Sequence, residues 1–572
     1  MAAVESNAGT ASNASTASRP WLKNYQPGVP ADIDIPADSL PEMLAASARR
    51  FGHRTALDFF GAATSYRELG DQVERAAEGL RRRGVGPGHR VALILPNCPQ
   101  HVVAFYAVLR LGAVVVEHNP LYTERELRHQ FEDHGATVAI VWNNVVEKIQ
   151  GFPQDIAVDT IVSVDIVRAM PRSKRLALRL PVPKARSARK ALTAVVRDAM
   201  PWQKLLRNKP LRRDYPQPGV EDLAAIQYTS GTTGHPKGAM LTHLNLRANA
   251  EQGSAWMHGA REGSEVMYAV LPMFHAFGMT LHLTFGILTG SRIVLFPKFD
   301  VDLVLAAAKK HPPTIFCAVP PIYERTAREA RKRGVDISSV RFAISGAMNL
   351  TQETVDLWES TAGGLLVEGY GMTEASPVAL GNPFADTRRN GSIGVPFPST
   401  EMRVVDPERP ANDVEPGQRG ELLIRGPQVF RGYWGKPEET AATLLDGGWL
   451  RTGDIVTVGP DHNATIVDRK KELIITGGFN VSPTEVEDAL RSHPDVVEAA
   501  AVGLPRAAGG EDVTAAVVLR PQATIDEAAL REYCRGRLSA YKVPRRIVPV
   551  DELPKSMLGK VLRKKVREQL SR

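Results

Sequence analysis

A repeated alternation of short β-branched runs and helical patterns is the feature that most constrains the fold of this chain. Helical patterns such as Tyr66–Arg83, Gln100–Leu111 and Val301–Lys310 lie between runs that end in loops rich in glycine or proline. Strands that alternate with helices favour an α/β fold with mostly parallel sheets. Ligands of such sheets bind at the carboxyl ends of the strands, so the loops there are candidate sites. The runs are Val91–Asn97, Ala113–Pro120, Ala225–Gly231, Thr314–Pro320, Val340–Gly346 and Leu365–Gly371.

The length of the chain predicts more than one domain. Its 572 residues exceed what a single hydrophobic core usually supports. Residues 1–18 are rich in Ala, Ser, Asn and Thr, without a basic start or an apolar run, so we expect a disordered tail and no secretory signal. The pattern changes near Lys471, where a charged run crosses into apolar residues. We therefore predict a large N-terminal domain over 19–470 and a small α/β domain over 471–572.

One uncharged stretch is long enough to cross a bilayer. No Asp, Glu, Lys or Arg lies between Glu265 and Arg292. The stretch contains Pro272, His275 and His282, and it lies inside the α/β pattern, so a buried segment that lines a pocket is favoured over a membrane span. The three cysteines form no metal-ligand spacing and no disulfide pattern, which fits a reducing cytosol.

The positive charge of the chain is concentrated in one segment. Residues 168–213 contain 15 Lys or Arg and one acid, Asp198, so this segment carries +14 while the rest of the chain sums to −6. Apolar residues are interspersed, and basic plus apolar residues at loose helical spacing favour contact with an anionic membrane surface. A solvated insert without a role and a nucleic-acid patch are the alternatives. No nucleic-acid fold motif accompanies the segment, so no nucleic-acid partner is expected. The apolar residues are Leu176, Leu178, Leu180, Val182, Leu192, Val195, Val196, Trp202, Leu205 and Leu206.

The loop Tyr228–Gly238, with the sequence YTSGTTGHPKG, is the strongest single signal. Glycines let backbone N–H groups turn toward an anion, four hydroxyls add donors and Lys237 adds a positive charge, so polyphosphate is the expected guest. The loop is not a Walker A motif, because His235 and Pro236 separate Gly234 from the lysine. The candidate phosphate-binding residues are Thr229, Ser230, Gly231, Thr232, Thr233, Gly234 and Lys237.

Further motifs follow this loop in order toward the C-terminus. Together with the loop, they resemble the adenylate-forming (ANL) superfamily of acyl-CoA synthetases, peptide-synthetase adenylation domains and beetle luciferases, over roughly residues 40–565. His118–Thr123 and Gly477–Pro483 look most like bacterial long-chain fatty acid–CoA ligases. The other motifs are Leu271–His275, Ser345–Ala347, Glu368–Glu374, Arg451–Asp454, Asp468–Ile474 and Pro554–Lys560.

The resemblance implies a reaction in two steps. ATP activates a carboxylic acid as acyl-AMP, and the acyl group then passes to a thiol. The expected cofactors and co-substrates are ATP, Mg²⁺ and coenzyme A. The carboxylate and the α-phosphate are both negative, so positive charge must surround the transition state. In the family, the small C-terminal domain is a mobile lid that carries the catalytic lysine.

The resemblance also assigns a role to each matching residue. Thr229 and Glu374 would hold Mg²⁺, which prefers few protein oxygens and several phosphate oxygens. Gly346, Ala347, Tyr370 and Gly371 would form the adenine slot, Thr373 would contact the α-phosphate, Asp454 would accept hydrogen bonds from the ribose hydroxyls and Arg469 would add positive charge.

Three further residues carry roles by resemblance alone. Lys560 would be the catalytic lysine; without the motif it would be one of 71 basic residues, most of them at the surface. His275 would lie beside the substrate carboxyl, although a lone histidine among apolar residues is often a core residue. Lys471 would be the hinge of the lid, with a plain surface lysine as the alternative. Ile475 departs from the family pattern, since some relatives carry a second lysine there.

The residues around His275 favour a fatty acid as the substrate. Phe274–Gly278 supplies no acid for the ammonium of an amino acid, and burying an unpaired ammonium would be costly. Apolar residues nearby suit an alkyl chain or an aromatic acid, and the basic segment favours a lipid. These apolar residues are Met273, Phe277, Met279, Leu281, Leu283 and Phe285.

Three other functions stay open at this stage. They are an aryl-CoA ligase, a fatty acyl-AMP ligase that loads a carrier protein, and a non-catalytic lipid-binding relative. No carrier module follows the Lys560 motif, so the thiol is expected from free coenzyme A or a separate carrier. We expect a cytoplasmic protein, with peripheral contact at the inner face of the membrane and the oligomeric state left open.

Overall fold

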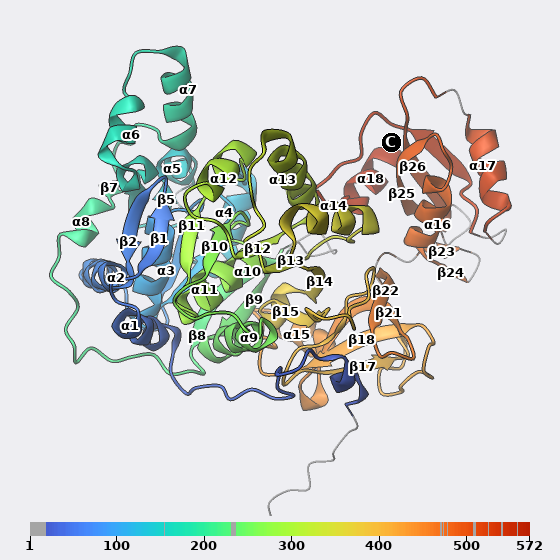
Figure 1. The fold of residues 1–572 in the computed structure, drawn as a ribbon, viewed down its shortest axis with the longest axis horizontal. Coiled ribbons are helices and arrows are strands. Elements are labelled where there is room, and N and C mark those ends of the chain that lie inside the picture. Colours follow the sequence, from blue (N-terminus) through green and yellow to red (C-terminus); the bar gives the residue numbers. More distant parts are fainter. Residues whose placement is uncertain are drawn as a thin grey trace, which may run out of the picture.

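The computed structural model shows a large N-terminal body and a smaller C-terminal lobe (Figure 1). It describes residues 19–572 apart from 154, 230–235, 470, 471, 473, 477, 478, 507–510, 524, 525, 539–541, 557, 558 and 572, and it describes 468, 469, 475, 479 and 480 without their side chains. The predicted tail 1–18, the loop residues Ser230–Gly234 and the proposed hinge Lys471 therefore lie outside the described residues.

An eight-stranded sheet carries the glycine–threonine loop at one of its strand ends. Its inner strands are parallel, while β9 runs antiparallel to β8, and β19 runs antiparallel to β9. The order is β19 (Gly432–Tyr433), β9 (Lys237–Thr242), β8 (Leu223–Thr229), β4 (Val114–Glu117), β3 (Arg90–Ile94), β5 (Val138–Trp142), β6 (Thr160–Val164) and β7 (Met200–Pro201).

A nine-stranded sheet forms the second layer of the N-terminal body. Its central strands are parallel and its two ends are closed by antiparallel strands. The prediction of an α/β fold with mostly parallel sheets is therefore confirmed. The order is β16 (Val395–Pro396), β15 (Val378–Gly381), β14 (Leu366–Gly371), β13 (Phe342–Ser345), β12 (Ile315–Ala318), β10 (Val266–Ala269), β11 (Arg292–Leu295), β1 (Thr55–Phe59) and β2 (Ala62–Ser65).

The helices of this body pack on the two sheets. Three of them, α2 (Tyr66–Arg81), α3 (Pro99–Leu109) and α12 (Val301–Ala308), match the predicted helical ranges to within two residues. The others are α1 (Leu40–Arg50), α4 (Glu124–His134), α5 (Val146–Gln150), α9 (His243–Trp256), α13 (Pro320–Arg333), α14 (Gln352–Ala362) and α15 (Pro437–Thr443), with short helices η1 (Pro20–Asn24), η2 (Asn143–Val145), η3 (Ile166–Ala169), η5 (Thr373–Ala375) and η6 (Asp446–Gly448).

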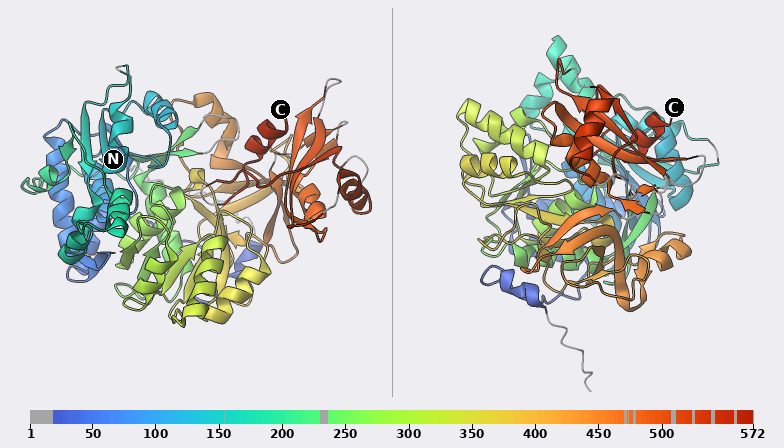
Figure 2. Two further views of the ribbon diagram at one scale, coloured as in Figure 1. Left: turned by 90° about the horizontal axis from the view of Figure 1, so that it is seen from above. Right: turned by 90° about the vertical axis from the view of Figure 1, so that its right-hand side faces the viewer.

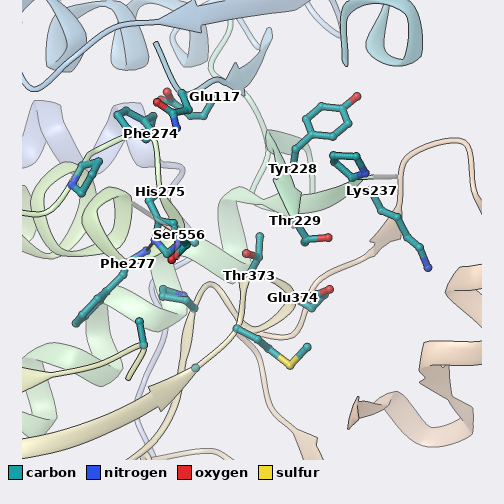
Figure 3. Close-up of a pocket in the computed structure, with 18 of the residues that line it drawn as sticks. Glu117, Tyr228, Thr229, Lys237, Phe274, His275, Phe277, Thr373, Glu374 and Ser556 are labelled. Carbon is teal, nitrogen blue, oxygen red and sulfur yellow. Dashed lines mark hydrogen bonds between the residues drawn. The ribbon is translucent and has the colours of Figure 1, made fainter. Parts of the chain in front are cut away.

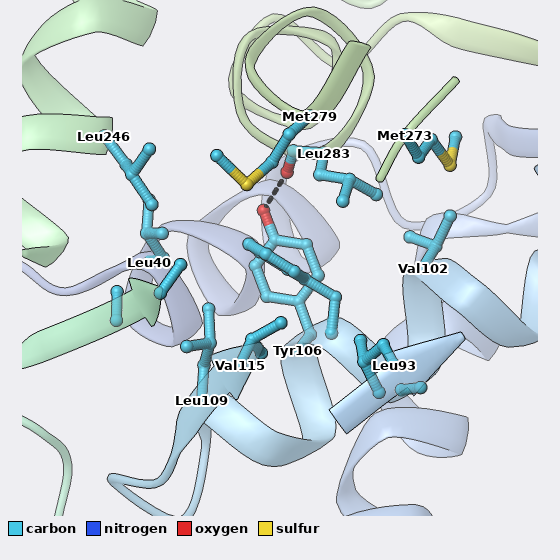
Figure 4. Close-up of a cluster of buried hydrophobic side chains, with 14 of the residues drawn as sticks. Leu40, Leu93, Val102, Tyr106, Leu109, Val115, Leu246, Met273, Met279 and Leu283 are labelled. Atoms are coloured by element: carbon cyan, nitrogen blue, oxygen red, sulfur yellow. Dashed lines mark hydrogen bonds between the residues drawn. The ribbon is translucent and has the colours of Figure 1, made fainter. Parts of the chain in front are cut away.

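Helix α3 lies at the centre of the core because its sequence is apolar on nearly every face. All of its residues are buried, which is typical of a helix that contacts other elements all round. Figure 4 shows Tyr106 of this helix among Leu93, Val115 and Leu246, with its hydroxyl donating a hydrogen bond to the backbone oxygen of Leu283. The core therefore joins α3 to the eight-stranded sheet and to the segment that follows Met279.

The uncharged stretch between Glu265 and Arg292 is buried in the body and is broken into short elements. They are β10, α10 (Ala276–Gly278), the π-helix η4 (Met279–Phe285) and α11 (Gly286–Leu288). Within the part of the chain that the structure describes, no helix is long and apolar enough to cross a membrane. The structure therefore confirms the prediction of a buried segment, which the sequence favours over a membrane span.

A third sheet and the C-terminal lobe complete the chain. The sheet contains β17 (Glu401–Val405), β18 (Gly420–Arg425), β21 (Trp449–Val458), β20 (Leu444–Leu445) and β22 (Ala464–Arg469). The lobe has its own apolar core and lies to one side of the body (Figure 2), so the prediction of a small C-terminal α/β domain is confirmed. Its elements are β23 (Ile474–Thr476), β24 (Phe479–Val481), α16 (Pro483–Arg491), β25 (Val496–Pro505), β26 (Glu511–Leu519), α17 (Glu527–Arg535), β27 (Arg546–Pro549) and α18 (Arg563–Leu570).

The basic segment 168–213 divides into an exposed part and a buried part. Its first half forms α6 (Arg172–Ala177) and α7 (Pro183–Leu192), and neither helix contains a buried residue. Its second half adds β7 to the sheet and continues into α8 (Gln203–Leu206), where Trp202 and Leu205 are fully buried. Leu205 packs against Gly79 of α2, where an added Cβ would lie 2.7 Å from its side chain. Grouping Trp202 and Leu205 with the membrane-facing apolar residues was therefore wrong, because both belong to the core.

Candidate active site

A cavity of about 2010 Å³ lies where the strand ends of the body face the C-terminal lobe. Figure 3 shows Thr229, Thr373 and Glu374 gathered on one side of it, and His275, Phe277 and Ser556 on the other. All of the predicted site residues that the structure describes with their side chains line this cavity. The predicted residues that line it are Thr229, Lys237, His275, Gly346, Ala347, Tyr370, Gly371, Thr373, Glu374, Asp454 and Lys560.

The glycine–threonine loop joins two antiparallel strands. Thr229 at the end of β8 and Lys237 at the start of β9 are directly paired, and both residues line the cavity. Strand β19 pairs with β9 and brings Tyr433 beside Lys237, whose ammonium lies 4.9 Å from the centre of the Tyr433 ring. The ring face thus holds the lysine through a cation–π contact.

Tyr433 also connects the lysine to Glu374. Its hydroxyl donates a hydrogen bond to Oε1 of Glu374 at 2.6 Å, and burial together with this carboxylate raises the pKa of Tyr433 well above its usual value. Sequence reasoning missed Tyr433, because its position depends on the pairing of β19 with β9 across almost 200 residues.

Two cavity residues suit a divalent ion that arrives with phosphate. Glu374 offers a carboxylate and Thr229 a hydroxyl, and both line the same side of the cavity. Among the residues that the structure describes, no group of three or more His, Cys, Asp or Glu could hold a metal ion. One carboxylate and one hydroxyl are too few for a protein cage, but they fit Mg²⁺, which takes most of its ligands from phosphate and water.

The residues of the predicted adenine slot line the same cavity. Gly346 follows β13, and a Cβ added there would lie 3.0 Å from the Phe277 ring, so a side chain would crowd the slot. Ala347 has a φ of +67°, which turns the chain away at this point. Gly371 has no room for a side chain either, since its added Cβ would lie 2.1 Å from the Pro377 oxygen. Close packing therefore requires glycine at both positions of the predicted adenine slot.

Tyr370 and Asp454 meet at the edge of this slot. The Tyr370 hydroxyl donates a hydrogen bond to Oδ2 of Asp454 at 2.6 Å, and both side chains are largely buried. Asp454 lies on β21 directly opposite Arg469 on β22, so the predicted ribose and phosphate residues are neighbours in the sheet. The structure describes only the backbone of Arg469.

His275 is accessible from the cavity and begins helix α10. Its Nδ1 accepts a hydrogen bond from the backbone N–H of Phe277 at 3.3 Å. The His275 side chain is exposed to the cavity, and the protein atoms that form the cavity around it reduce its hydration and lower the pKa of His275 to about 4. The imidazole is therefore neutral at neutral pH and, with Nδ1 accepting, carries its proton on Nε2, where it can donate to a carboxylate.

Two amides that sequence reasoning missed hold the His275 segment in place. Asn97 donates to the backbone oxygens of Ala269 and Leu271 at 2.9 and 2.8 Å, and its Oδ1 accepts from the Met273 N–H at 2.8 Å. Gln227 donates to the Phe274 oxygen at 2.6 Å. Both amides lie within the predicted runs Val91–Asn97 and Ala225–Gly231, but only the fold shows that they contact this segment.

Lys560 reaches the cavity from a turn of the C-terminal lobe. Its backbone N–H donates to Oγ of Ser556 at 3.1 Å, and Gly559 before it has a φ of +82°, which favours glycine. A Cβ added to Gly559 would lie 3.5 Å from Met348, so this turn lies against the loop that follows Ala347. Lys555 and Lys565 of the lobe also line the cavity and add to its positive charge.

The cavity continues as an apolar groove between α9 and η4. Asn249, Gly253 and Met257 face it at a spacing of four residues, and Leu281 and Phe285 face it from the other side. The neighbouring residue Trp256 stacks on the cavity residue Phe397, with ring centres 4.4 Å apart. At Gly253 the two helices are close, since an added Cβ would lie 3.4 Å from the Phe285 ring.

Three of the six apolar residues expected near the substrate do not line the groove. Met273, Met279 and Leu283 pack in the core around α3 instead, as Figure 4 shows. Phe277, Leu281 and Phe285 line the cavity as expected. Met279 and Leu283 share one face of η4, which packs in the core, whereas Leu281 and Phe285 share the opposite face.

Comparison with known proteins places the chain among enzymes that bind AMP. The family model described as AMP-binding enzyme matches residues 44–434, and the model of the AMP-binding enzyme C-terminal domain matches residues 485–560. The long-chain-fatty-acid–CoA ligase of Bacillus subtilis is 38% identical over 551 residues, which cover 96% of this chain and 98% of that protein. The ligase of the same name from Escherichia coli O157:H7 is 37% identical over 557 residues, with the same coverage. Among solved structures, ATP-bound MatB from Rhodopseudomonas palustris superimposes with a TM-score of 0.76 at 30% identity and covers 93% of this chain and 99% of that chain.

Proposed function

Because this chain belongs to the AMP-binding enzyme family, we propose that it is an acid–thiol ligase for long-chain fatty acids. ATP and the fatty acid give acyl-AMP and pyrophosphate, and coenzyme A then gives acyl-CoA and AMP. The names of the relatives from Bacillus subtilis and Escherichia coli, which match over 96% of the chain, support this substrate and this acceptor. The observation that carries the proposal is a single cavity in which an apolar groove leads past His275 to Lys560 and the nucleotide residues.

The first step needs positive charge at the α-phosphate. An oxygen of the fatty acid carboxylate attacks the α-phosphorus, and pyrophosphate leaves with the electrons of the broken bond. His275 donates its Nε2 proton in a hydrogen bond to the carboxylate and orients it. The ammonium of Lys560 lies between the carboxylate and the α-phosphate and offsets the charge that develops there. Mg²⁺ bound by Thr229 and Glu374 would neutralise charge on the phosphates.

The nucleotide is held by the slot and by the glycine–threonine loop. The adenine ring lies between the Gly346–Ala347 loop and the Tyr370–Gly371 strand end. Asp454 accepts hydrogen bonds from the ribose hydroxyls, while the Tyr370 hydroxyl fixes the orientation of its carboxylate. The loop Thr229–Lys237 binds the β- and γ-phosphates. Thr373 contacts the α-phosphate, and Arg469 adds positive charge nearby.

The second step requires the C-terminal lobe to move. We propose a lid that extends from Lys471 to the C-terminus and turns about Lys471 against a body formed by residues 19–470. In one pose Lys560 lies in the cavity, as the contact of its turn with Met348 supports. In the other pose the lysine withdraws and the thiol of coenzyme A attacks the acyl carbonyl, so that AMP leaves.

A panel of acids tests the function against its alternatives. The protein is incubated with ATP, Mg²⁺, coenzyme A and acids from acetate to oleate plus benzoate and coumarate, and AMP and acyl-CoA are measured. We expect the highest kcat/KM for long alkyl acids. A preference for aryl acids would indicate an aryl-CoA ligase. Release of AMP-ester without thioester would indicate loading of a carrier protein, and no pyrophosphate with any acid would indicate a non-catalytic relative.

We also propose that the basic segment 168–213 contacts an anionic membrane, the place where long-chain fatty acids partition. Its charge of +14 and its exposed apolar side chains support this contact.

A further inference from the structure

The hairpin formed by α6 and α7 presents charge and apolar surface together. Between Arg172 and Arg197 there are nine basic residues and no acidic residue. Four of the seven large hydrophobic side chains that are exposed among the described residues lie between positions 176 and 195. They are Leu176, Leu180, Val182 and Val195, which are 63, 54, 46 and 82% exposed. So much exposed apolar surface on a short basic hairpin marks an interaction surface.

The hairpin lines a basic cleft. An open cleft of about 700 Å³ is lined by Arg179, Arg186, Arg189 and Lys190, with Leu180 and Pro181 at its apolar part. Within the described part of the chain, no acidic side chain lies within 4.0 Å of these four cations as a salt-bridge partner. Four cations around one cleft therefore offer their charge to a ligand rather than to the protein.

The position of the hairpin is fixed by hydrogen bonds to the end of β5. Trp142 donates through its indole N–H to the Leu192 oxygen at 2.8 Å, and Asn144 donates to the Lys190 oxygen at 2.9 Å. Asn143 donates to the Ala194 oxygen at 3.0 Å. These bonds hold α7 in one orientation, so the hairpin projects from the body as Figure 1 shows. These three side-chain hydrogen bonds favour an ordered hairpin over a solvated insert without a role.

We propose that the α6–α7 hairpin docks on an anionic phospholipid bilayer, with a lipid phosphate in the cleft and Leu176, Leu180 and Val182 in the headgroup region. This inference names the contact point of the membrane association proposed above and rests on it. Phosphate groups match the four cations, while the apolar rim matches the boundary with the acyl chains. A nucleic acid would use the cations but leave the exposed leucines in water.

Vesicle binding by the intact protein tests the inference. Flotation with phosphatidylcholine vesicles is compared with flotation on vesicles that also contain phosphatidylglycerol, at low and at high salt and without ATP. We expect binding only to the anionic vesicles, with a strong loss at high salt. The variant R179Q/R186Q/R189Q/K190Q should weaken binding by about a hundredfold or more, since each basic residue near such a surface contributes about fivefold.

A matched control separates the site from net charge. The variant R409Q/R419Q/R520Q/R535Q removes the same number of exposed cations elsewhere and should keep most of the binding. The variant L176S/L180S/V182S should also weaken vesicle binding, which would not occur if only charge mattered. Equal losses in the two glutamine variants, no effect of the serine variant, or binding of duplex DNA without vesicle binding would each overturn the inference.

Ligase activity on a short soluble acid distinguishes this inference from the proposed function. Both hairpin variants should retain wild-type kcat/KM for octanoate in solution, because the hairpin is not part of the cavity lining. Vesicle binding without any ligase activity would contradict the proposed function and leave the inference standing. Ligase activity without vesicle binding would overturn the inference and the membrane contact on which it rests, and leave the proposed ligase activity standing.

Discussion

Gly253 sets the width of the groove that is proposed to hold the acyl chain. It lies on α9 between Asn249 and Met257 and faces Phe285 of η4. A Cβ added there would lie 3.4 Å from the Phe285 ring, an ordinary van der Waals distance, so an alanine fits. A leucine adds three further carbons, which have no space except the groove itself. Gly253→Leu should therefore block the passage toward Met257.

The loss can be estimated from the part of the acyl chain that the leucine displaces. Four side-chain carbons exclude about four methylenes, and each buried methylene contributes about 0.8 kcal/mol, so the loss is about 3 kcal/mol. This corresponds to a decrease of about 150-fold in kcat/KM for palmitate. An acid too short to reach Gly253 should be affected little, so the preference should shift toward short acids.

The assay measures kcat/KM of Gly253→Leu for even-numbered acids from butyrate to palmitate. Gly253→Ala is the control: its methyl fits, and alanine in place of a helical glycine stabilises the helix by about 0.5–1 kcal/mol. We expect alanine to retain the wild-type profile with a higher Tm. An unchanged ratio of palmitate to butyrate in a folded leucine variant would refute the assignment of the groove to the acyl chain.

Four further predictions concern the chemistry and the lid. Lys560→Ala should lower acyl-AMP formation by about 100-fold or more but still convert supplied acyl-AMP to thioester, and equal loss of both steps would contradict its role. Lys471→Pro should keep adenylation and impair thiol transfer, because proline stiffens the proposed hinge; unchanged transfer in stopped-flow assays would count against hinge motion. Tyr433→Phe keeps the ring beside Lys237 but removes the hydrogen bond to Glu374, so KM for ATP should rise about tenfold, whereas an unaltered KM would show that this bond is dispensable. Because reduced hydration lowers the pKa of His275 to about 4, its imidazole should lose its charge as pH rises through about 4 and stay neutral above about 5. An NMR titration that gave the ordinary pKa of histidine would contradict this expectation.

Local pattern predicted the α/β fold class and several of its helices and strands, and the family resemblance predicted most residues of the site. The ranges of α2, α3 and α12 follow from helical periodicity, and the parallel strands follow from β-branched runs that end in loops. The motif residues from Thr229 to Lys560 are far apart in the chain, yet those that the structure describes with side chains meet in one cavity. Such motifs can be recognised in the sequence because each contains the residue types that one chemical group of the ligand requires.

Only the tertiary structure decided which face each side chain presents and what lies opposite it. Tyr433 reaches Lys237 through the pairing of β19 with β9, and such long-range pairing has no local signature. Met279 and Leu283 share one face of η4 while Leu281 and Phe285 share the other, but only the packing around α3 decides which of the two faces lies in the core. The basic segment reads as one stretch, but packing against α2 buried Trp202 and Leu205 and left Leu176 and Leu180 in solvent. Sequence pattern specifies what each residue can do, while burial depends on neighbours that only the folded chain supplies.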